Sequence, residues 1–247
     1  MKKKHPHLST ISVLHFVKLF LRSLLFLAVL LAYIFEKTAL LTRSPALAIL
    51  TWVFFVTEMV FRFFPSKLES MGCQKQFAKN FKPISEDAVA VNQSWKVTAA
   101  VTAAWLLLNG IFGVLYFTKL IDAGILILIS IAFSVCDIIC ILFFCPFQTW
   151  FMKNRCCTTC RIYNWDFAMM FTPLVFIPSL YTWSLLGCAL LLLLRWEITY
   201  RLHPERFSEK TNACMSCAQC KEKLCSHKKQ LQGFLKKYKS KFFPTNK

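Results

Sequence analysis

Five long apolar runs constrain this chain more than any other feature of its sequence. They cover about residues 19–35, 46–64, 97–117, 123–144 and 167–194 of the 247 residues. A helix needs about 20 consecutive apolar residues to cross the hydrocarbon core of a bilayer. Barrel strands alternate polar and apolar positions, and these runs do not, so they predict helices. The expected fold is an all-α, polytopic transmembrane helical bundle.

The composition agrees with a membrane location. Hydrophobic residues make up 56% of the chain and charged residues 17%, whereas charged residues are about a quarter of a typical soluble domain. The formal net charge of +18 comes from basic residues that lie between the apolar runs and toward the C-terminus. A nucleic-acid partner would require a soluble basic face. The pattern instead favours the lipid bilayer as partner, with anionic lipid at the basic tail.

The distribution of Lys and Arg predicts the topology of the chain in the cell membrane. With a cytoplasmic N-terminus, five crossings divide the basic residues almost evenly between the two sides, whereas an even number places nearly all of them inside. Pro173 and Pro178 interrupt the last run, so a re-entrant half-helix followed by a full span would return the tail to the cytoplasm. One tilted helix over the same residues is the alternative.

The chain is therefore expected to have two parts. Residues 1–195 form a transmembrane helical domain of five or six membrane segments, and residues 196–247 form a cysteine-rich, basic, cytoplasmic tail. Apolar residues at helical spacing over 231–242, with lysines between them, predict an amphipathic helix in that tail. Such a helix lies on an anionic membrane surface. A soluble helix that packs on the loops is the alternative.

Two clusters of cysteines are the main chemical signal. Three tail cysteines are spaced two residues apart and a fourth follows, while the loop before the last run holds a Cys-Cys-x2-Cys cluster. Thiolates at this spacing can reach one zinc ion, and similar runs hold iron–sulfur clusters. We expect the two clusters to meet at the cytoplasmic face and bind zinc or an iron–sulfur cluster. The predicted metal ligands are Cys214, Cys217, Cys220, Cys225, Cys156, Cys157 and Cys160.

Three other roles are compatible with the same cysteines. They could be small buried hydrophobic residues in a reducing cytoplasm. They could form disulfides if the tail lies outside the cell, or carry lipid because they are close to the membrane. Cys136, Cys140 and Cys145 lie in or just after the fourth apolar run and add to the thiol content of the chain.

Ionisable residues inside apolar runs are functional candidates, because charge is costly in a membrane. Glu58 precedes Arg62 by four residues, which predicts an ion pair on one helix. Asp137 lies in the fourth run with no cationic neighbour in sequence. It predicts either a hydrogen bond to Asn109 of the third run or a proton or metal path. Asp166 or Asn164 is expected to cap the helix of the last run.

Several catalytic motifs are absent from the sequence. It contains no Walker-type loop, GxGxxG, GxSxG or HExxH motif, so nothing in it indicates an ordinary hydrolase or a nucleotide-driven pump. The predicted function is that of a non-enzymatic integral membrane protein that uses metal for structure, metal handling or electron transfer. The alternatives are a metal-free scaffold or accessory subunit, and a small transporter that uses Asp137.

Overall fold

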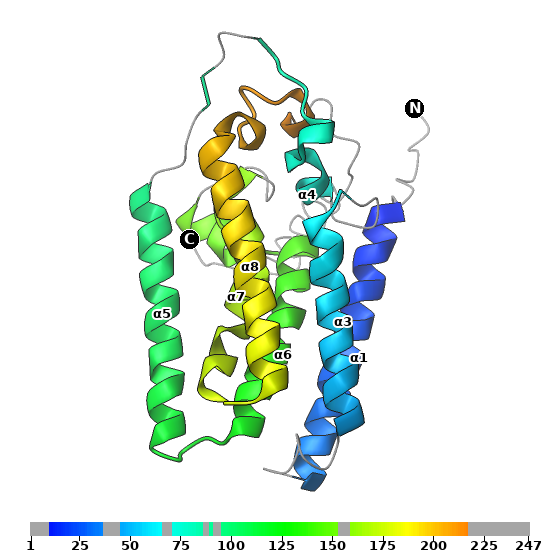
Figure 1. Ribbon diagram of the computed structural model, residues 1–247, viewed down its shortest axis with the longest axis vertical. Coiled ribbons are helices and arrows are strands. Elements are labelled where there is room, and N and C mark those ends of the chain that lie inside the picture. Colours follow the sequence, from blue (N-terminus) through cyan, green and yellow to red (C-terminus); the bar gives the residue numbers. More distant parts are fainter. Residues whose placement is uncertain are drawn as a thin grey trace, which may run out of the picture.

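The computed structural model describes residues 10–36, 45–65, 71–85, 89–90, 95–152 and 159–216. Within these ranges the regular structure is helical, and pairing of strand type is limited to one isolated bridge between Pro83 and Asn212. Four helices are long and apolar enough to cross a membrane (Figure 1). They are α1 (Thr10–Glu36), α3 (Pro45–Phe63), α5 (Trp95–Phe117) and α6 (Ala123–Leu142). The all-helical prediction is confirmed, and four of the expected five or six membrane segments are helices that could span a membrane.

The long helices alternate in direction along the bundle (Figure 1). The start of α1, the end of α3 and the start of α5 lie at one end, which we call the head end. The short helix α4 (Met71–Gln76) and the 3-10 turn η2 (Ala78–Asn80) also lie there. At the opposite end, Asp122 caps α6, because its Oδ1 accepts a hydrogen bond from the Ile125 amide at 2.9 Å.

The last apolar run forms a hairpin instead of one tilted helix. α7 (Asp166–Phe171) and the 3-10 turn η6 (Thr172–Phe176) lead away from the head end, and α8 (Leu180–Leu202) returns to it (Figure 1). Pro173 lies in the first turn of η6, and Pro178 lies in the reversal. Proline lacks an amide hydrogen and clashes with the preceding turn of a helix, which explains why the run breaks here. The chain after α8 therefore lies at the head end.

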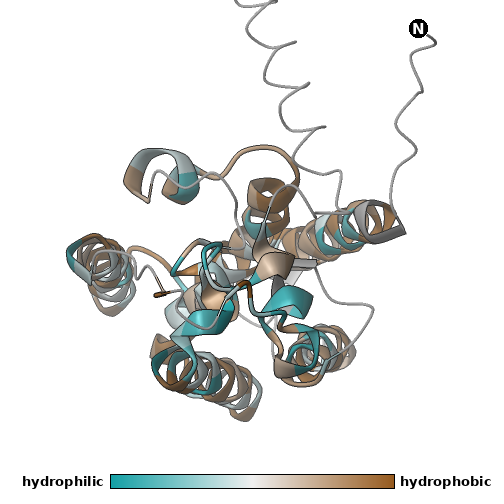
Figure 2. Cartoon of the chain, turned by 90° about the horizontal axis from the view of Figure 1, so that it is seen from above, coloured by the Kyte–Doolittle hydropathy of each residue, from teal (hydrophilic) through white to brown (hydrophobic). Residues whose placement is uncertain are grey.

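The core of the bundle lies where α3, α6, α7 and α8 meet. Phe55 of α3 and Phe171 of α7 are fully buried, with their ring centroids 5.0 Å apart in an edge-to-face contact. On the outer faces, large apolar side chains such as Phe20 and Leu107 are exposed. Figure 2 shows hydrophobic residues along the long helices and hydrophilic ones in the short segments at the viewed end. Outer faces of this kind suit lipid and not water.

α5 is attached to the bundle mainly through η6. Gly113 makes this contact possible, because a Cβ atom there would come within 2.6 Å of Cζ of Phe176. A Cβ atom at Gly110, one turn earlier, would meet nothing within 4 Å. The missing side chain at Gly113 therefore allows close packing, as small residues do between membrane helices.

The segment after α8 is fixed to the α4 region at the head end. It contains the 3-10 turns η7 (Pro204–Phe207) and η8 (Ala213–Met215). Asn212 is 0% exposed, and its Nδ2 donates to the backbone oxygens of Lys75 at 3.1 Å and Arg206 at 2.9 Å. The Ala213 amide also donates to the Lys82 oxygen at 2.8 Å. Residues 203–216 are thus held by buried hydrogen bonds. The predicted amphipathic helix over 231–242 lies outside the described residues.

Candidate functional site

Six ionisable side chains from four helices meet inside the bundle, toward its head end. We call them the ion cluster. α1 and α3 provide the cations and one acid, and α6 and the start of α7 provide the other two acids. The members are Lys18, Arg22, Glu58, Arg62, Asp137 and Asp166. The three cations formally balance the three carboxylates, which is how charges are tolerated in a membrane interior.

Arg22 is the centre of the ion cluster, with its side chain 2% exposed. One terminal nitrogen donates to Oε2 of Glu58 at 2.7 Å. The other donates to the backbone oxygen of Ser134 at 2.7 Å and to Oδ2 of Asp137 at 3.2 Å. Lys18 approaches the second Glu58 oxygen at 3.3 Å. One guanidinium therefore connects α1 to both α3 and α6.

The second part of the ion cluster is the ion pair between Arg62 of α3 and Asp166 of α7. The ring of Phe167 is close to both arginines, with its centroid 6.0 Å from the Arg22 guanidinium carbon and 5.5 Å from that of Arg62. Cations at these distances are attracted to the face of an aromatic ring. The ring thus contacts both guanidinium groups of the ion cluster.

These contacts correct three sequence-based expectations. Glu58 binds Arg22 and Lys18 of α1, and Arg62 binds an acid of α7, so the expected ion pair within α3 does not describe the site. Asp137 binds Arg22, whereas the Asn109 amide donates to the Trp105 oxygen of its own helix at 2.9 Å. Asp166 makes no capping hydrogen bond, because its carboxylate is turned toward Arg62.

A larger cavity adjoins the ion cluster between α5, α6 and α7. It has a volume of about 310 Å³. Six sulfur-containing side chains line it, so we call it the thiol cavity. These are Cys136, Cys140, Cys145, Cys160, Met169 and Met170. Asp137 and Asp166 form part of its wall and also line a small cavity of about 20 Å³ that contains Arg22 and Arg62. The carboxylate ends of the two ion pairs therefore face the sulfur atoms.

Two thiols of the thiol cavity contact each other. The side chains of Cys140, in the last turn of α6, and Cys145, just after it, form a hydrogen bond. The Gln148 amide also donates to Sγ of Cys145 at 3.4 Å. Both residues are thiols and not disulfides. The end of α6 and the turn that follows it thus hold two sulfur atoms side by side.

Some polar atoms beside the thiol cavity lack a hydrogen-bond partner among the described residues. Asp166 uses Oδ2 for Arg62, but its buried Oδ1 has no partner, although the side chain is only 9% exposed. The indole nitrogen of Trp105, on the α5 wall of the cavity, is also buried and has no hydrogen-bond partner among the described residues. Leaving a buried polar group unsatisfied costs about 1–3 kcal/mol. An acceptor and a donor are therefore available to a molecule in the cavity.

The predicted metal ligands are only partly within the described structure. Cys160 is buried and lines the thiol cavity, and Cys214 lies in η8 at the head end, partly exposed. Among the described residues, no three His, Cys, Asp or Glu side chains are grouped so that they could hold a metal ion. Five predicted ligands lie outside the described residues, so the shared metal site stays a prediction. They are Cys156, Cys157, Cys217, Cys220 and Cys225.

The loop that carries Cys160 is tied to α8. Arg161 donates to both carboxylate oxygens of Glu197, to Oε1 at 2.6 Å, and Trp165 donates to the same Oε1 at 2.6 Å. The Arg161 guanidinium also stacks 3.9 Å from the Tyr200 ring centroid. Burial alone would raise the pKa of Glu197, but these donors outweigh it and lower that pKa below its ordinary value.

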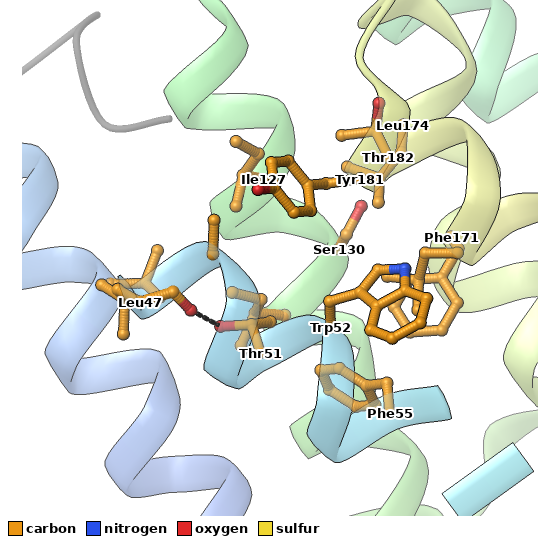
Figure 3. Close-up of a pocket in the computed structure, with 14 residues that line it drawn as sticks. Leu47, Thr51, Trp52, Phe55, Ile127, Ser130, Phe171, Leu174, Tyr181 and Thr182 are labelled. Carbon is orange, nitrogen blue, oxygen red and sulfur yellow. Dashed lines mark hydrogen bonds between the residues drawn. The ribbon is translucent and has the colours of Figure 1, made fainter. Parts of the chain in front are cut away.

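A second cavity, farther from the head end, is too small for most ligands. Side chains of α3, α6 and α8 converge on it, among them Trp52, Ser130 and Thr182 (Figure 3). Its volume is about 60 Å³, whereas a cavity that binds benzene has about 150 Å³. Trp52 donates to Oγ of Ser184 at 2.9 Å. This cavity is therefore a feature of helix packing, and the thiol cavity is the better candidate for binding.

Sequence reasoning missed the role of α1 in the site. Lys18 and Arg22 of α1 are spaced four residues apart, as are Glu58 and Arg62 of α3. Matched spacing on two antiparallel apolar helices was a usable signal for pairing between them.

No protein-family model matches this chain, and comparisons with curated proteins and with solved structures returned no significant similarity.

Proposed function

We propose that this chain is a multi-pass cell-membrane protein with six membrane segments, whose head end faces the cytoplasm and binds metal. The metal is zinc or an iron–sulfur cluster, and its ligands come from the loop cysteines at 156–160 and the tail cysteines at 214–225. The four apolar helices support the membrane location. The α7–α8 hairpin supplies the two further segments and gives the even number that the basic residues favour.

The link between Arg161 and Glu197 is the observation that carries this proposal. Arg161 follows Cys160 directly, and Glu197 lies near the head end of α8, whose continuation leads to Cys214. Both cysteine clusters are therefore connected to the same end of the bundle. Metal bound between them would hold the tail against the loop, because bound metal adds its binding free energy to the folded state. Its role would be structural, metal handling or electron transfer.

Metal analysis of the purified full-length chain tests this proposal. Anaerobic purification in detergent should give a protein with zinc by elemental analysis, or with iron and a visible iron–sulfur absorption band. Cys217→Ser with Cys220→Ser should release the metal, and so should Cys156→Ser with Cys157→Ser. Cys188→Ser, in the middle of α8, is the matched control and should keep it. Native protein without metal, or metal that survives both double substitutions, would overturn the proposal.

The transporter alternative is less well supported than metal binding. Asp137 is held by Arg22, which also binds Glu58 and the Ser134 carbonyl. An acid fixed in a charge-balanced cluster is better suited to joining helices than to moving along a transport path. A metal-free scaffold is the function that fits if metal analysis of the native protein is negative.

A further inference from the structure

We propose that the thiol cavity is a second metal site, in which Cys140 and Cys145 bind one soft monovalent ion, Cu(I) in chemical character. This site lies inside the bundle and uses residues that are not ligands in the loop-and-tail site. It does not depend on zinc or iron–sulfur binding at the head end, so the two proposals can fail separately.

The geometry of the two thiols suits a two-coordinate ion. Cys140 and Cys145 are already in hydrogen-bond contact, on the last turn of a long helix and on the turn that follows it. A d10 monovalent ion is stable with two thiolates on opposite sides, and therefore needs no third strong ligand. Each thiol that coordinates releases its proton to solvent.

The lining of the cavity selects for a soft cation. Thiolate and thioether sulfur favour Cu(I) over the hard ions that prefer oxygen ligands. Cys136, Cys160, Met169 and Met170 provide further sulfur around the pair. No Lys, Arg or His lines this cavity among the described residues, and the charged groups that do are Asp137 and Asp166. Both carboxylates are paired with arginines of the ion cluster, so they add no unbalanced charge to the cavity.

The size of the cavity and its unsatisfied polar atoms support occupancy. At about 310 Å³ it has more room than the ion alone requires, so water or a small carrier ligand can enter with the ion. Oδ1 of Asp166 can accept a hydrogen bond from such a molecule, and the Trp105 indole can donate one. The site therefore offers sulfur for the ion and hydrogen bonds for what accompanies it.

Anaerobic Cu(I) titration against the chromogenic chelator bicinchoninate tests the site in the full-length chain. The most informative starting variant has serine in place of the five loop and tail cysteines outside the described residues (156, 157, 217, 220 and 225). This variant should still bind one equivalent of Cu(I). Cys140→Ser and Cys145→Ser should each weaken that binding by about a hundredfold or more, the upper range for disturbing a metal's surroundings. Cys188→Ser should leave it unchanged.

The native chain gives a second readout if the background variant does not fold. There, Cys140→Ser with Cys145→Ser should lower Cu(I) stoichiometry by one equivalent while zinc or iron content stays constant. X-ray absorption at the copper edge should show two sulfur ligands. Unchanged Cu(I) affinity and stoichiometry in the Cys140 and Cys145 variants would overturn the proposal. Loss of all Cu(I) binding upon substitution of the tail cysteines alone would also overturn it.

Discussion

The ion cluster and the thiol cavity share a wall, yet their buried polar groups differ in how many partners they have. In the ion cluster, Arg22 has two carboxylates and a backbone carbonyl as partners, and four helices contribute. On the α5 side, the Trp105 indole nitrogen and Oδ1 of Asn109 are buried with no partner among the described residues. α5 itself is attached mainly through η6.

The difference separates structural polarity from polarity that is available for binding. A charge-balanced cluster holds helices together through several ion pairs and hydrogen bonds, although some of its buried atoms, such as Nε of Arg22, have no hydrogen-bond partner among the described residues. Unsatisfied donors and acceptors beside a cavity lower stability unless a molecule binds there. We therefore interpret the ion cluster as the structural link between the helices, and the thiol cavity as the candidate ligand-binding site. The following variants test this division, from the largest expected effect to the smallest.

Loss of the central guanidinium should have the largest effect. Arg22→Met leaves Glu58 and Asp137 without their main cation, and removing one partner of a buried ion pair costs about 3–5 kcal/mol. The measurement is the free energy of unfolding in mixed detergent micelles. Adding Glu58→Gln and Asp137→Asn to the same chain should recover most of the loss, because the cation that then lacks its partner, Lys18, has a side chain that is 22% exposed. If Arg22→Met is as stable as the wild type, the ion cluster is not what holds the helices together.

The two acids that bind Arg22 should differ in importance. Glu58 binds both Arg22 and Lys18, so Glu58→Gln weakens two ion pairs and should cost about 3 kcal/mol. Asp137 is one of three acceptors for Arg22, so Asp137→Asn should cost only about 1 kcal/mol. The same unfolding measurement compares them. Equal losses would contradict the central position given to Glu58.

Paired alanine substitutions test the attachment of α5. Gly113→Ala places a methyl group against the Phe176 ring and should destabilise the α5–η6 contact by about 1–3 kcal/mol. Gly110→Ala has open space and should be neutral or stabilising by about 0.5–1 kcal/mol. Protease sensitivity of the turn between α5 and α6, together with the melting temperature, measures both. If the two variants behave alike, α5 is not held where η6 meets Gly113.

The stability contributed by the contact between Arg161, in the loop that carries Cys160, and Glu197 of α8 should depend on pH. Glu197→Gln replaces the carboxylate that accepts from Arg161 and should cost about 1–2 kcal/mol at neutral pH. Because the folded-state pKa of Glu197 is lowered, its contribution is complete above the ordinary value of 4.5 and is lost as the pH falls through the lower folded value. The stability difference between wild type and variant should therefore disappear in acid. A difference that persists there would assign the effect to packing.

The sequence predicted the helices better than it predicted their contacts. Apolar length alone located the four long helices, because a bilayer requires that length. Pro173 and Pro178 indicated where the last run breaks. The partners of Glu58 and Asp137 were missed, because a cation on α1 reaches them only after three helices pack together.

The thiol cavity likewise could be predicted from the sequence only within one helix. Cys136 and Cys140 are spaced to lie on one face of α6, and this much is readable from the sequence. Their meeting with Cys160 and Met170 depends on the path of the chain after α6 and on the start of the α7–α8 hairpin. Local spacing carries no information about that path.

Thiol accessibility in intact cells tests the central claim, that the hairpin returns the chain to a cytoplasmic head end. Native protein treated with a membrane-impermeant maleimide should stay unlabelled until the cells are permeabilised, because the proposed topology assigns its cysteines to the cytoplasmic side or to the interior of the membrane. Lys119→Cys, in the turn between α5 and α6, should be labelled in intact cells and serves as the positive control. Labelling of the native chain from outside, with the tail cysteines modified, would contradict the account.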